Sequence, residues 1–296
     1  MSGTEFLKSI LIPVDRSASS LMAEDMAAKI AKKTGAKVTV LHVILRGFSY
    51  VQSETTYTVP EKISDEILGS LEQEAEKIVS NARDLFGEEK VLVDTEILRE
   101  DDAADTILKY SEEDFDLIIM GAHGENEKDP YALGSVTKRV TAHAKCPVLI
   151  TKKASSLSKM LVGVDGSRNS TKALEYAVKL AEKMGSEITM LNVQEHRLHK
   201  ASPEVAEELG DKIFSKASDA IGKQKLKIEK RLEIGVTSDK IFEVAEKGNY
   251  DLIVLGSRGL GTVKRFLLGS ISDDVSHKAK CSVLIVPQTR TQMDQV

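Results

Sequence analysis

The chain has 296 residues, of which 41% are hydrophobic and 29% charged, and its formal net charge is −5. This composition is typical of globular domains and gives no reason to expect a nucleic-acid partner, because the charge is negative and only 4% of the residues are aromatic. No apolar stretch is long enough to span a bilayer and the N-terminus lacks a signal-like segment, so we expect no membrane partner and a cytoplasmic location.

The first half of the chain predicts strands that alternate with helices. We expect strands at 9–15, 37–44, 90–98, 116–121 and 147–151, and helices at 19–34, 60–86, 101–113 and 134–144. The strands are short, nearly continuous apolar runs, which indicates a parallel sheet covered by helices on both faces.

The second half repeats this order after a polar, aperiodic linker at 153–158. We expect its strands at 160–165, 187–193, 226–234, 250–256 and 282–287, and its helices at 169–184, 203–223, 237–247 and 270–280. The predicted fold class is therefore α/β, with two tandem, doubly wound, five-stranded Rossmann-like domains at 1–152 and 159–296. Ligands of such sheets bind at the carboxyl ends of the strands, where the strand order reverses.

A glycine pattern occurs once in each half, at an offset of 135 residues. Gly121-Ala122-His123-Gly124 and Gly134-Ser135 correspond to Gly256-Ser257-Arg258-Gly259 and Gly269-Ser270, with nine residues between the two parts of each copy. Earlier segments repeat at an offset of 150, so the first half carries 15 additional residues in its middle. A period of this length is that of a whole domain rather than of a solenoid repeat.

Each copy of the pattern connects a buried strand to the start of an amphipathic helix, an arrangement that suits a phosphate group. We expect Gly256 and Gly259 to allow a positive φ and to remove a Cβ that would block the ligand. Gly269 and Ser270 would present amides and a hydroxyl at the positive end of a helix dipole. The alternative is that these glycines serve only tight turns and helix packing.

Cys146 and Cys281 occupy the same place in the two halves, just before the last strand. This equivalence favours two small buried residues over a disulfide, and no CxxC or histidine cluster indicates a metal site. No arrangement of catalytic residues recurs in both halves, so the sequence predicts no catalytic residues.

These features together resemble the universal stress protein family over nearly the whole chain, as in its tandem members. The features are an apolar first strand ending in Asp, the motif G-x2-G-x9-G-[ST] after the fourth strand, and a closing segment such as Cys146-Pro147-Val148-Leu149-Ile150. The resemblance implies binding of ATP or AMP, with Mg²⁺ when more than one phosphate is present. It places the loop and the helix-start serine at the phosphates, the Asp at the ribose and the end of the second strand at adenine.

Carried over residue by residue, the resemblance gives seven binding candidates in each half. Those of the second half are Asp165, Val193, Gly256, Gly259, Gly269, Ser270 and Ile271. Those of the first half are Asp15, Val43, Gly121, Gly124, Gly134, Ser135 and Val136.

The two halves differ in the charges around these candidates. The first half has Glu125, Glu127 and Asp129 between the two parts of its motif, where the second half has Lys264 and Arg265. The first half also has Glu100, followed by Asp101 and Asp102, where the second half has Gly235. Such a run is usually solvated surface, but close to a phosphate it works against anion binding. We therefore expect the first half to bind nucleoside triphosphates more weakly than the second, or to prefer AMP or no nucleotide.

Other nucleotide-dependent classes lack their motifs. A dehydrogenase would need G-x-G-x-x-G after the first strand, and a P-loop NTPase would need G-x-x-x-x-G-K-[ST], and neither occurs. A regulatory nucleotide-binding stress protein, a scaffold with one or both sites empty, and a weak ATPase remain. The family also implies that the halves pair through their last strands as an internal pseudo-dimer, and a homodimer of chains stays open.

Overall fold

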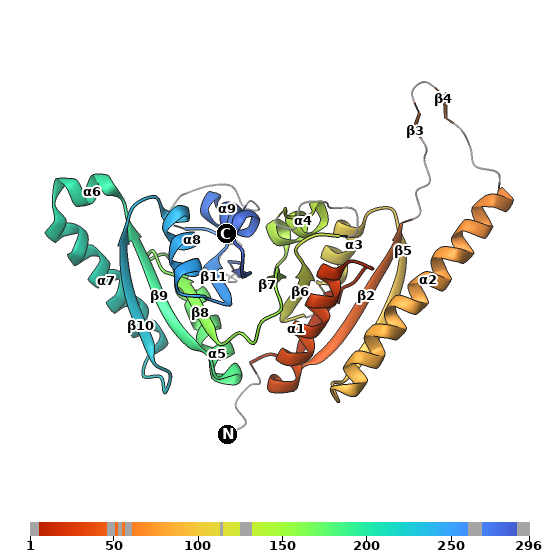
Figure 1. Ribbon diagram of the computed structural model, residues 1–296, viewed down its shortest axis with the longest axis horizontal. Coiled ribbons are helices and arrows are strands. Elements are labelled where there is room, and N and C mark those ends of the chain that lie inside the picture. The colour runs from red at the N-terminus through yellow and green to blue at the C-terminus, as the bar shows by residue number, and fades with distance from the viewer. Residues whose placement is uncertain are drawn as a thin grey trace, which may run out of the picture.

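The two halves of the chain form one continuous sheet. The computed structural model describes residues 6–45, 51–52, 55–56, 61–112, 115–124, 132–259 and 268–288, with the backbone alone for 51–52, 55–56 and 61–66. Within these residues a ten-stranded sheet has the order β10-β9-β8-β11-β12-β7-β6-β1-β2-β5 (Figure 1).

The first half contains the elements β1 (Ser9–Pro13), α1 (Ala18–Thr34), β2 (Lys37–Leu45), β3 (Val51–Gln52), β4 (Thr55–Thr56), α2 (Glu61–Glu88), β5 (Val93–Glu100), α3 (Ala103–Tyr110), β6 (Leu117–Gly121), α4 (Ser135–His143) and β7 (Val148–Thr151). The second half contains β8 (Lys159–Gly163), α5 (Arg168–Met184), β9 (Glu187–Gln194), α6 (His196–Ala201), α7 (Pro203–Ile221), β10 (Ile228–Ile234), α8 (Thr237–Lys247), β11 (Leu252–Gly256), α9 (Ser270–Lys278) and β12 (Ser282–Val286).

Five strands of each half pair in parallel, which confirms the predicted fold class of two doubly wound units. β1 lies between β2 and β6, and β8 lies between β9 and β11. The chain therefore moves outward in both directions from the first strand of each half, and the order reverses beside that strand.

The first helix of each half begins and ends by the same local signals. Ser17 and Ser167 cap α1 and α5 by accepting the amides of Ser20 and Ser170. Both helices end at a glycine with a left-handed backbone, Gly35 at φ 80° and Gly185 at φ 73°.

Three small elements were not expected from the sequence, and one helix is shorter than expected. β3 and β4 form a short antiparallel pair within the additional residues of the first half, and α6 precedes α7 in the second half. The helix expected at 101–113 spans only Ala103–Tyr110. The sequence of α6, HRLHKA, has no apolar periodicity, and none of its residues is buried.

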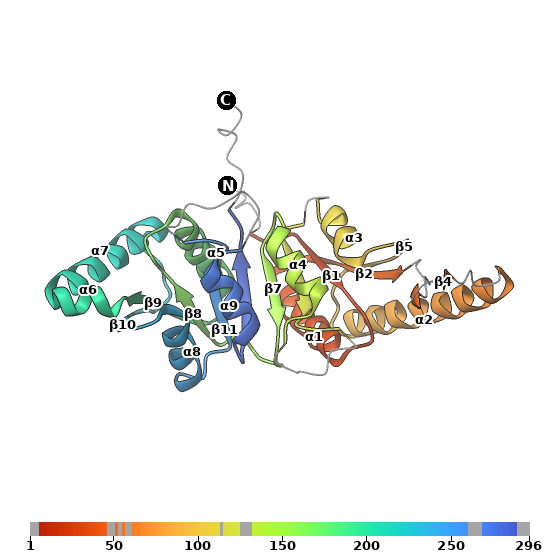
Figure 2. The same cartoon turned by 90° about the horizontal axis from the view of Figure 1, so that it is seen from above.

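The halves meet through their last strands, β7 and β12, which pair antiparallel. Leu284 lies opposite Leu149, with Val283 opposite Ile150 and Ile285 opposite Val148. Figure 2 shows these strands side by side at the centre of the molecule. Because each strand would otherwise be an open, apolar edge, this pairing removes two templates for aggregation.

The hydrophobic core differs between the two faces of the sheet. On the face of α1, α2, α5 and α7, one cluster of buried residues continues from the first half into the second. On the opposite face the core is divided into one cluster under α3 and α4 and another under α8 and α9. In Figure 1, α4 and α9 lie above the central strands and α1 and α5 below them. The two halves therefore share a core on one side only.

Both cysteines are free, as the sequence analysis expected. They pack in the two separate clusters, and burial raises the pKa of the Cys146 thiol to about 12 and that of Cys281 to about 11. Since only a thiolate is a good nucleophile, these side chains act as apolar packing groups.

Candidate functional site

Each half has a cavity at the carboxyl ends of its central strands. Site 1, of about 470 Å³, is lined by all seven candidates of the first half, and site 2, of about 640 Å³, by all seven of the second. The structure thus brings together residues that lie more than 100 positions apart in each half. Both sites lie where the strand order reverses, the usual ligand position in this class of sheet.

The glycines that begin the two loops are required for packing against a helix. A Cβ on Gly121 would lie 2.7 Å from the backbone carbon of Ser19, and one on Gly256 would lie 2.8 Å from that of Asn169. Either contact is too close for a side chain. The packing role, which the sequence analysis kept as the alternative, therefore explains these two positions.

The second glycine of each loop contacts an acidic side chain instead. A Cβ on Gly124 would lie 2.9 Å from Oδ2 of Asp15, and one on Gly259 would lie 2.6 Å from Oδ2 of Asp165. These glycines leave space beside the carboxylate that lines each cavity.

The expectation of a positive φ at Gly256 and Gly259 was wrong. Among the described residues, the glycines with positive φ are Gly35, Gly166, Gly185, Gly222 and Gly235, and none belongs to either loop. The loop glycines are selected by the space around Cβ rather than by left-handed dihedral angles.

The helices that face the cavities start without side-chain caps. Gly134 and Gly269 are the N-cap residues of α4 and α9, and neither helix has a side-chain cap hydrogen bond. The first intrahelical bonds of these helices begin at the amides of Lys138 and Asp273. The amides of the preceding residues therefore have no partner within the helix, and they lie at its positive end. An uncapped helix start at a cavity wall is suited to an anion.

One carboxylate oxygen in each site is fixed by the protein. Asp15 accepts the amide of Ser17 at 2.9 Å, and Asp165 accepts the amide of Ser167 at the same distance. Both bonds use Oδ1, so that Oδ2 is the oxygen that faces the loop glycine. The repeated Asp-x-Ser spacing is the sequence signal for this arrangement, although the sequence analysis did not assign a role to the serines.

A second pair of contacts ties each helix to its loop. The hydroxyl of Thr137 donates to the carbonyl of Gly121 at 2.8 Å, and the hydroxyl of Ser272 donates to that of Gly256 at 2.8 Å. The strand end and the helix start therefore form one fixed unit in both sites.

The second strand of each half carries a different polar side chain. Nδ1 of His42 lies 2.8 Å from the carbonyl of Val14, whereas Asn192 donates to Val164 at 2.7 Å and accepts from Gln194 at 2.6 Å. Both side chains line their cavities next to Val43 and Val193. They brace the first strand against the second, and the amide in site 2 is held on both sides.

Glu24 is a polar residue near site 1 that the sequence analysis missed. It is 3% exposed, and its carboxylate accepts from the hydroxyl of Ser20, which itself accepts the amide of Asp15. Burial raises the pKa of Glu24 to about 7, and the nearby charge of Asp15 adds to the shift. The counterpart in the second half is Leu174, which is fully buried. A comparison of the repeats gives the signal, namely an acid where the other copy has leucine.

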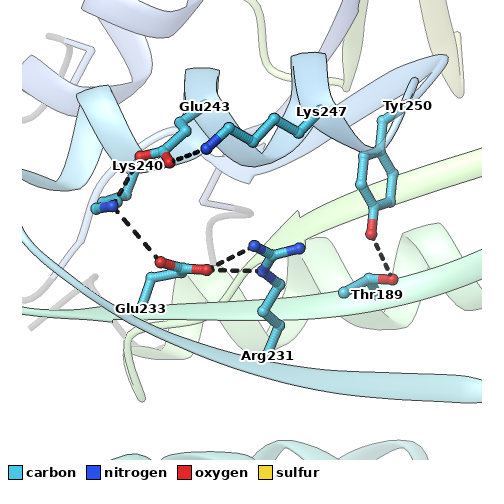
Figure 3. A network of polar contacts seen from close by, with 7 residues as sticks. All are labelled: Thr189, Arg231, Glu233, Lys240, Glu243, Lys247 and Tyr250. Carbon is cyan, nitrogen blue, oxygen red and sulfur yellow. Dashed lines mark hydrogen bonds and ion pairs between the residues drawn. The ribbon is translucent and has the colours of Figure 1, made fainter.

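Ion pairs hold the wall of site 2 that α8 provides. Lys240 contacts Glu243 at 2.7 Å and Glu233 at 3.7 Å, and Glu233 accepts from Arg231 (Figure 3). The stem of Lys240 passes 3.1 Å from the Cβ position of Gly235, a residue with φ 155°. The glycine after β10 thus makes room for this lysine.

The acidic run of the first half has a structural role. Asp102 caps α3 through the amide of Asp105, and Arg139 of α4 contacts both carboxylates at 2.7 and 2.5 Å. Residues 100–102 do not line site 1. Asp102 of this run is therefore paired with Arg139, and the run lies outside the cavity lining; its effect on an anion stays a prediction. Glu125, Glu127, Asp129, Lys264 and Arg265 lie outside the described residues.

Two doubly wound units, each with a cavity between a glycine loop and an uncapped helix, define a tandem α/β protein with duplicated cavities. The sequence profile of the Universal stress protein family matches residues 7–152 and 157–287. The chain belongs to the universal stress protein family.

Individual relatives agree with this assignment. The chain is 30% identical to a universal stress protein from Mycolicibacterium smegmatis over 300 residues, covering 96% of this chain and 98% of that protein. It is 34% identical to universal stress protein YxiE from Bacillus subtilis over 146 residues, which cover 44% of this chain and 98% of the relative. The crystal structure of a universal stress protein from Archaeoglobus fulgidus has the same fold, with a TM-score of 0.70 at 24% identity over 94% of this chain and 98% of that one. No helix in the described part of the chain is long and apolar enough to cross a membrane.

Proposed function

We propose that the second half binds ATP, ADP or AMP in site 2, and that the protein is a regulatory nucleotide-binding member of its family. The observation that carries this proposal is the start of α9, which has no side-chain cap and whose first residues line the cavity together with Gly259 and Asp165. Phosphate oxygens would accept the amides of these first residues, and Oδ2 of Asp165 would accept a ribose hydroxyl. Adenine would lie at the end of β9, next to Val193.

Mg²⁺ would accompany a di- or triphosphate and be held chiefly by the phosphates. Within the described ranges, no group of three His, Cys, Asp or Glu side chains offers a protein-made metal site. Mg²⁺ bound to a nucleotide usually keeps several water ligands and needs few ligands from the protein.

The first test is to identify copurified nucleotide by chromatography of a denatured protein sample. Recovery of an adenine nucleotide supports the proposal. A sample without nucleotide that also gives no heat on titration with ATP or AMP would favour a scaffold with empty sites. Single-turnover assays would detect slow hydrolysis and so address the weak ATPase.

The duplicated loops supply a sharper test with its own control. Replacing Gly259 by Val places a branched side chain against Asp165. Even the Cβ atom alone would lie 2.6 Å from Oδ2 of that residue. We expect nucleotide affinity at site 2 to fall at least tenfold in calorimetry. Gly124→Val makes the equivalent change at site 1 and should leave site 2 unaffected. Unchanged affinity in a folded Gly259→Val protein would reassign the loop to a purely structural role.

A further inference from the structure

The third residue of each glycine loop differs in charge between the two sites. His123 and Arg258 occupy equivalent positions, because a Cβ on Gly134 would lie 3.1 Å from the Cα of His123 and one on Gly269 would lie 3.4 Å from the Cα of Arg258. Gly134 and Gly269 are the N-caps of α4 and α9, so each of these residues adjoins the expected phosphate position. Both line their cavities.

The two residue types differ in what they offer a phosphate chain. An arginine carries a fixed positive charge and five N–H donors, whereas a histidine ring has two nitrogens and no fixed charge. Among the described residues that line site 1, the ionisable ones are Asp15, His42 and His123, with no Lys or Arg. In site 2 they are Asp165, Glu195 and Arg258, and Glu195 directly follows β9.

The surroundings of the two sites add to this difference. In the first half the buried Glu24 is linked through the hydroxyl of Ser20 to the amide of Asp15, whereas the second half has the uncharged Leu174 at the equivalent position. Residues 1–152 carry 27 Asp and Glu against 18 Lys and Arg, a formal charge of −9, and residues 159–296 carry 19 against 22, a formal charge of +3. The formal charges of the two halves therefore differ in sign, in the direction that favours an anion in the second half.

His123 also has an unmet bonding capacity. Its Nδ1 atom is buried and has no hydrogen-bond partner in the described structure. Buried polar atoms usually have a partner, so this nitrogen is consistent with a site that a ligand completes.

We propose that the third loop residue sets the ligand charge of each site: His123 restricts site 1 to adenine ligands with at most one phosphate, and Arg258 allows site 2 to hold ATP or ADP. This inference rests on the proposed function and assigns a ligand class to each site. It makes the two halves complementary rather than redundant, because one chain can hold a mono- and a polyphosphorylated adenine ligand together.

The test is calorimetry on the full chain at pH 7.5 with ATP and with AMP. The unmodified protein should bind about one ATP but two AMP per chain. His123→Arg should raise ATP affinity at site 1 about tenfold or more, so that a second ATP is seen, since one added charge near a phosphate has that order of effect. Arg258→His should weaken ATP binding at site 2 by a similar factor and change AMP binding less.

A matched control separates local from global charge. His143→Arg adds the same charge to α4, at its exposed C-terminal end and away from the cavity. It should leave ATP binding unchanged. AMP binding by each variant shows that its sites are intact.

Two equal ATP sites in the unmodified chain would overturn the inference and leave the proposed function standing. A His123→Arg protein that binds AMP but no second ATP would also overturn it, as would an equal gain from His143→Arg. Absence of any adenine ligand from both sites would reject the proposed function itself.

Discussion

Gly256 and Gly259 lie three residues apart in the same loop, yet a side chain at each would meet different atoms. The backbone of Asn169 blocks the first position, and the carboxylate of Asp165 blocks the second. A motif match alone cannot separate these roles, because both residues are simply glycine in the sequence. The two roles can be distinguished only when the positions of the neighbouring helix and turn are known, and these come from residues more than 80 positions earlier in the chain.

The repeat nevertheless makes much of the site predictable at the residue scale. All fourteen candidates line the two cavities, because aligned copies of one fold place aligned residues alike. What the motif could not reveal is Glu24, since nothing local distinguishes a buried acid from the surface acid Asp25 beside it. Burial depends on which face of α1 meets the sheet.

Glu24 predicts a pH dependence of stability that belongs to the first half alone. Its pKa is raised from 4.5 to about 7 in the folded protein, so between these values only the unfolded chain loses the proton. Stability therefore falls as the pH rises from about 4.5 to 7, and the full cost, about 3 kcal/mol by the usual conversion, is present above pH 7.

Glu24→Gln removes this titration. We expect the variant to gain stability relative to the unmodified protein by up to about 3 kcal/mol as the pH increases from 4.5 to 8. Denaturant unfolding at several pH values measures the difference. Glu24→Leu, which copies the second half, should remove the same pH dependence, and a difference that stays constant with pH would contradict the assignment.

At the scale of elements, the two kinds of helix in each half have opposite starts. α1 and α5 are capped by serines, whereas α4 and α9 begin at a glycine without a side-chain cap. A glycine at the N-cap costs a few tenths of a kcal/mol of helix stability relative to Ser or Asp. The uncapped start occurs at the same place in both halves, beside a cavity each time, and such a helix start suits an anion.

Gly269→Asp tests this interpretation directly. Gly269 has φ −67° and ψ 150°, a conformation that a capping aspartate adopts, although its Cβ would lie a close 3.3 Å from the carbonyl of Ser257. The carboxylate would accept the free amides of α9 and repel phosphate. We expect ATP affinity at site 2 to fall more than tenfold while thermal stability is kept or increased. Gly269→Ala, which adds the Cβ without the cap, is the control, and equal losses in both variants would mean that only the close contact matters.

Element prediction succeeded where periodicity was strong and failed where it was absent. The ten sheet strands and the long helices follow from apolar runs and repeated caps. β3 and β4 are short and lie in a segment that has no counterpart in the second half. α6 is also short, and none of its residues is buried. Neither the apolar pattern nor the repeat could therefore indicate these three elements.

At the scale of the whole molecule, the junction between the halves is part of a shared core. β7 pairs with β12, and the buried cluster on the α1 and α5 face contains residues of both halves. Phe6 packs edge-on against Tyr176 at 4.9 Å between ring centroids, and Lys152 donates to the carbonyl of His277 at 2.9 Å. The last strands, which the family resemblance predicts to pair with each other, are therefore internal strands of one sheet.

This shared core predicts that the two halves unfold together. Separating them would expose two strand edges and open the cluster, so we expect one transition in differential scanning calorimetry. ATP at 100 times its dissociation constant for site 2 should stabilise the native state by about 2.7 kcal/mol, and the whole transition should move to higher temperature.

Because the halves are coupled, hydrogen exchange of the slowest amides in β1 and β6 should slow as well, although these strands lie in the half that holds site 1. Phe6→Ala weakens the junction without touching either cavity, and it should reduce this transmitted protection while leaving ATP affinity unchanged. Two separate transitions in the unmodified protein, only one of which responds to ATP, would show that the halves are independent domains joined by a strand pair.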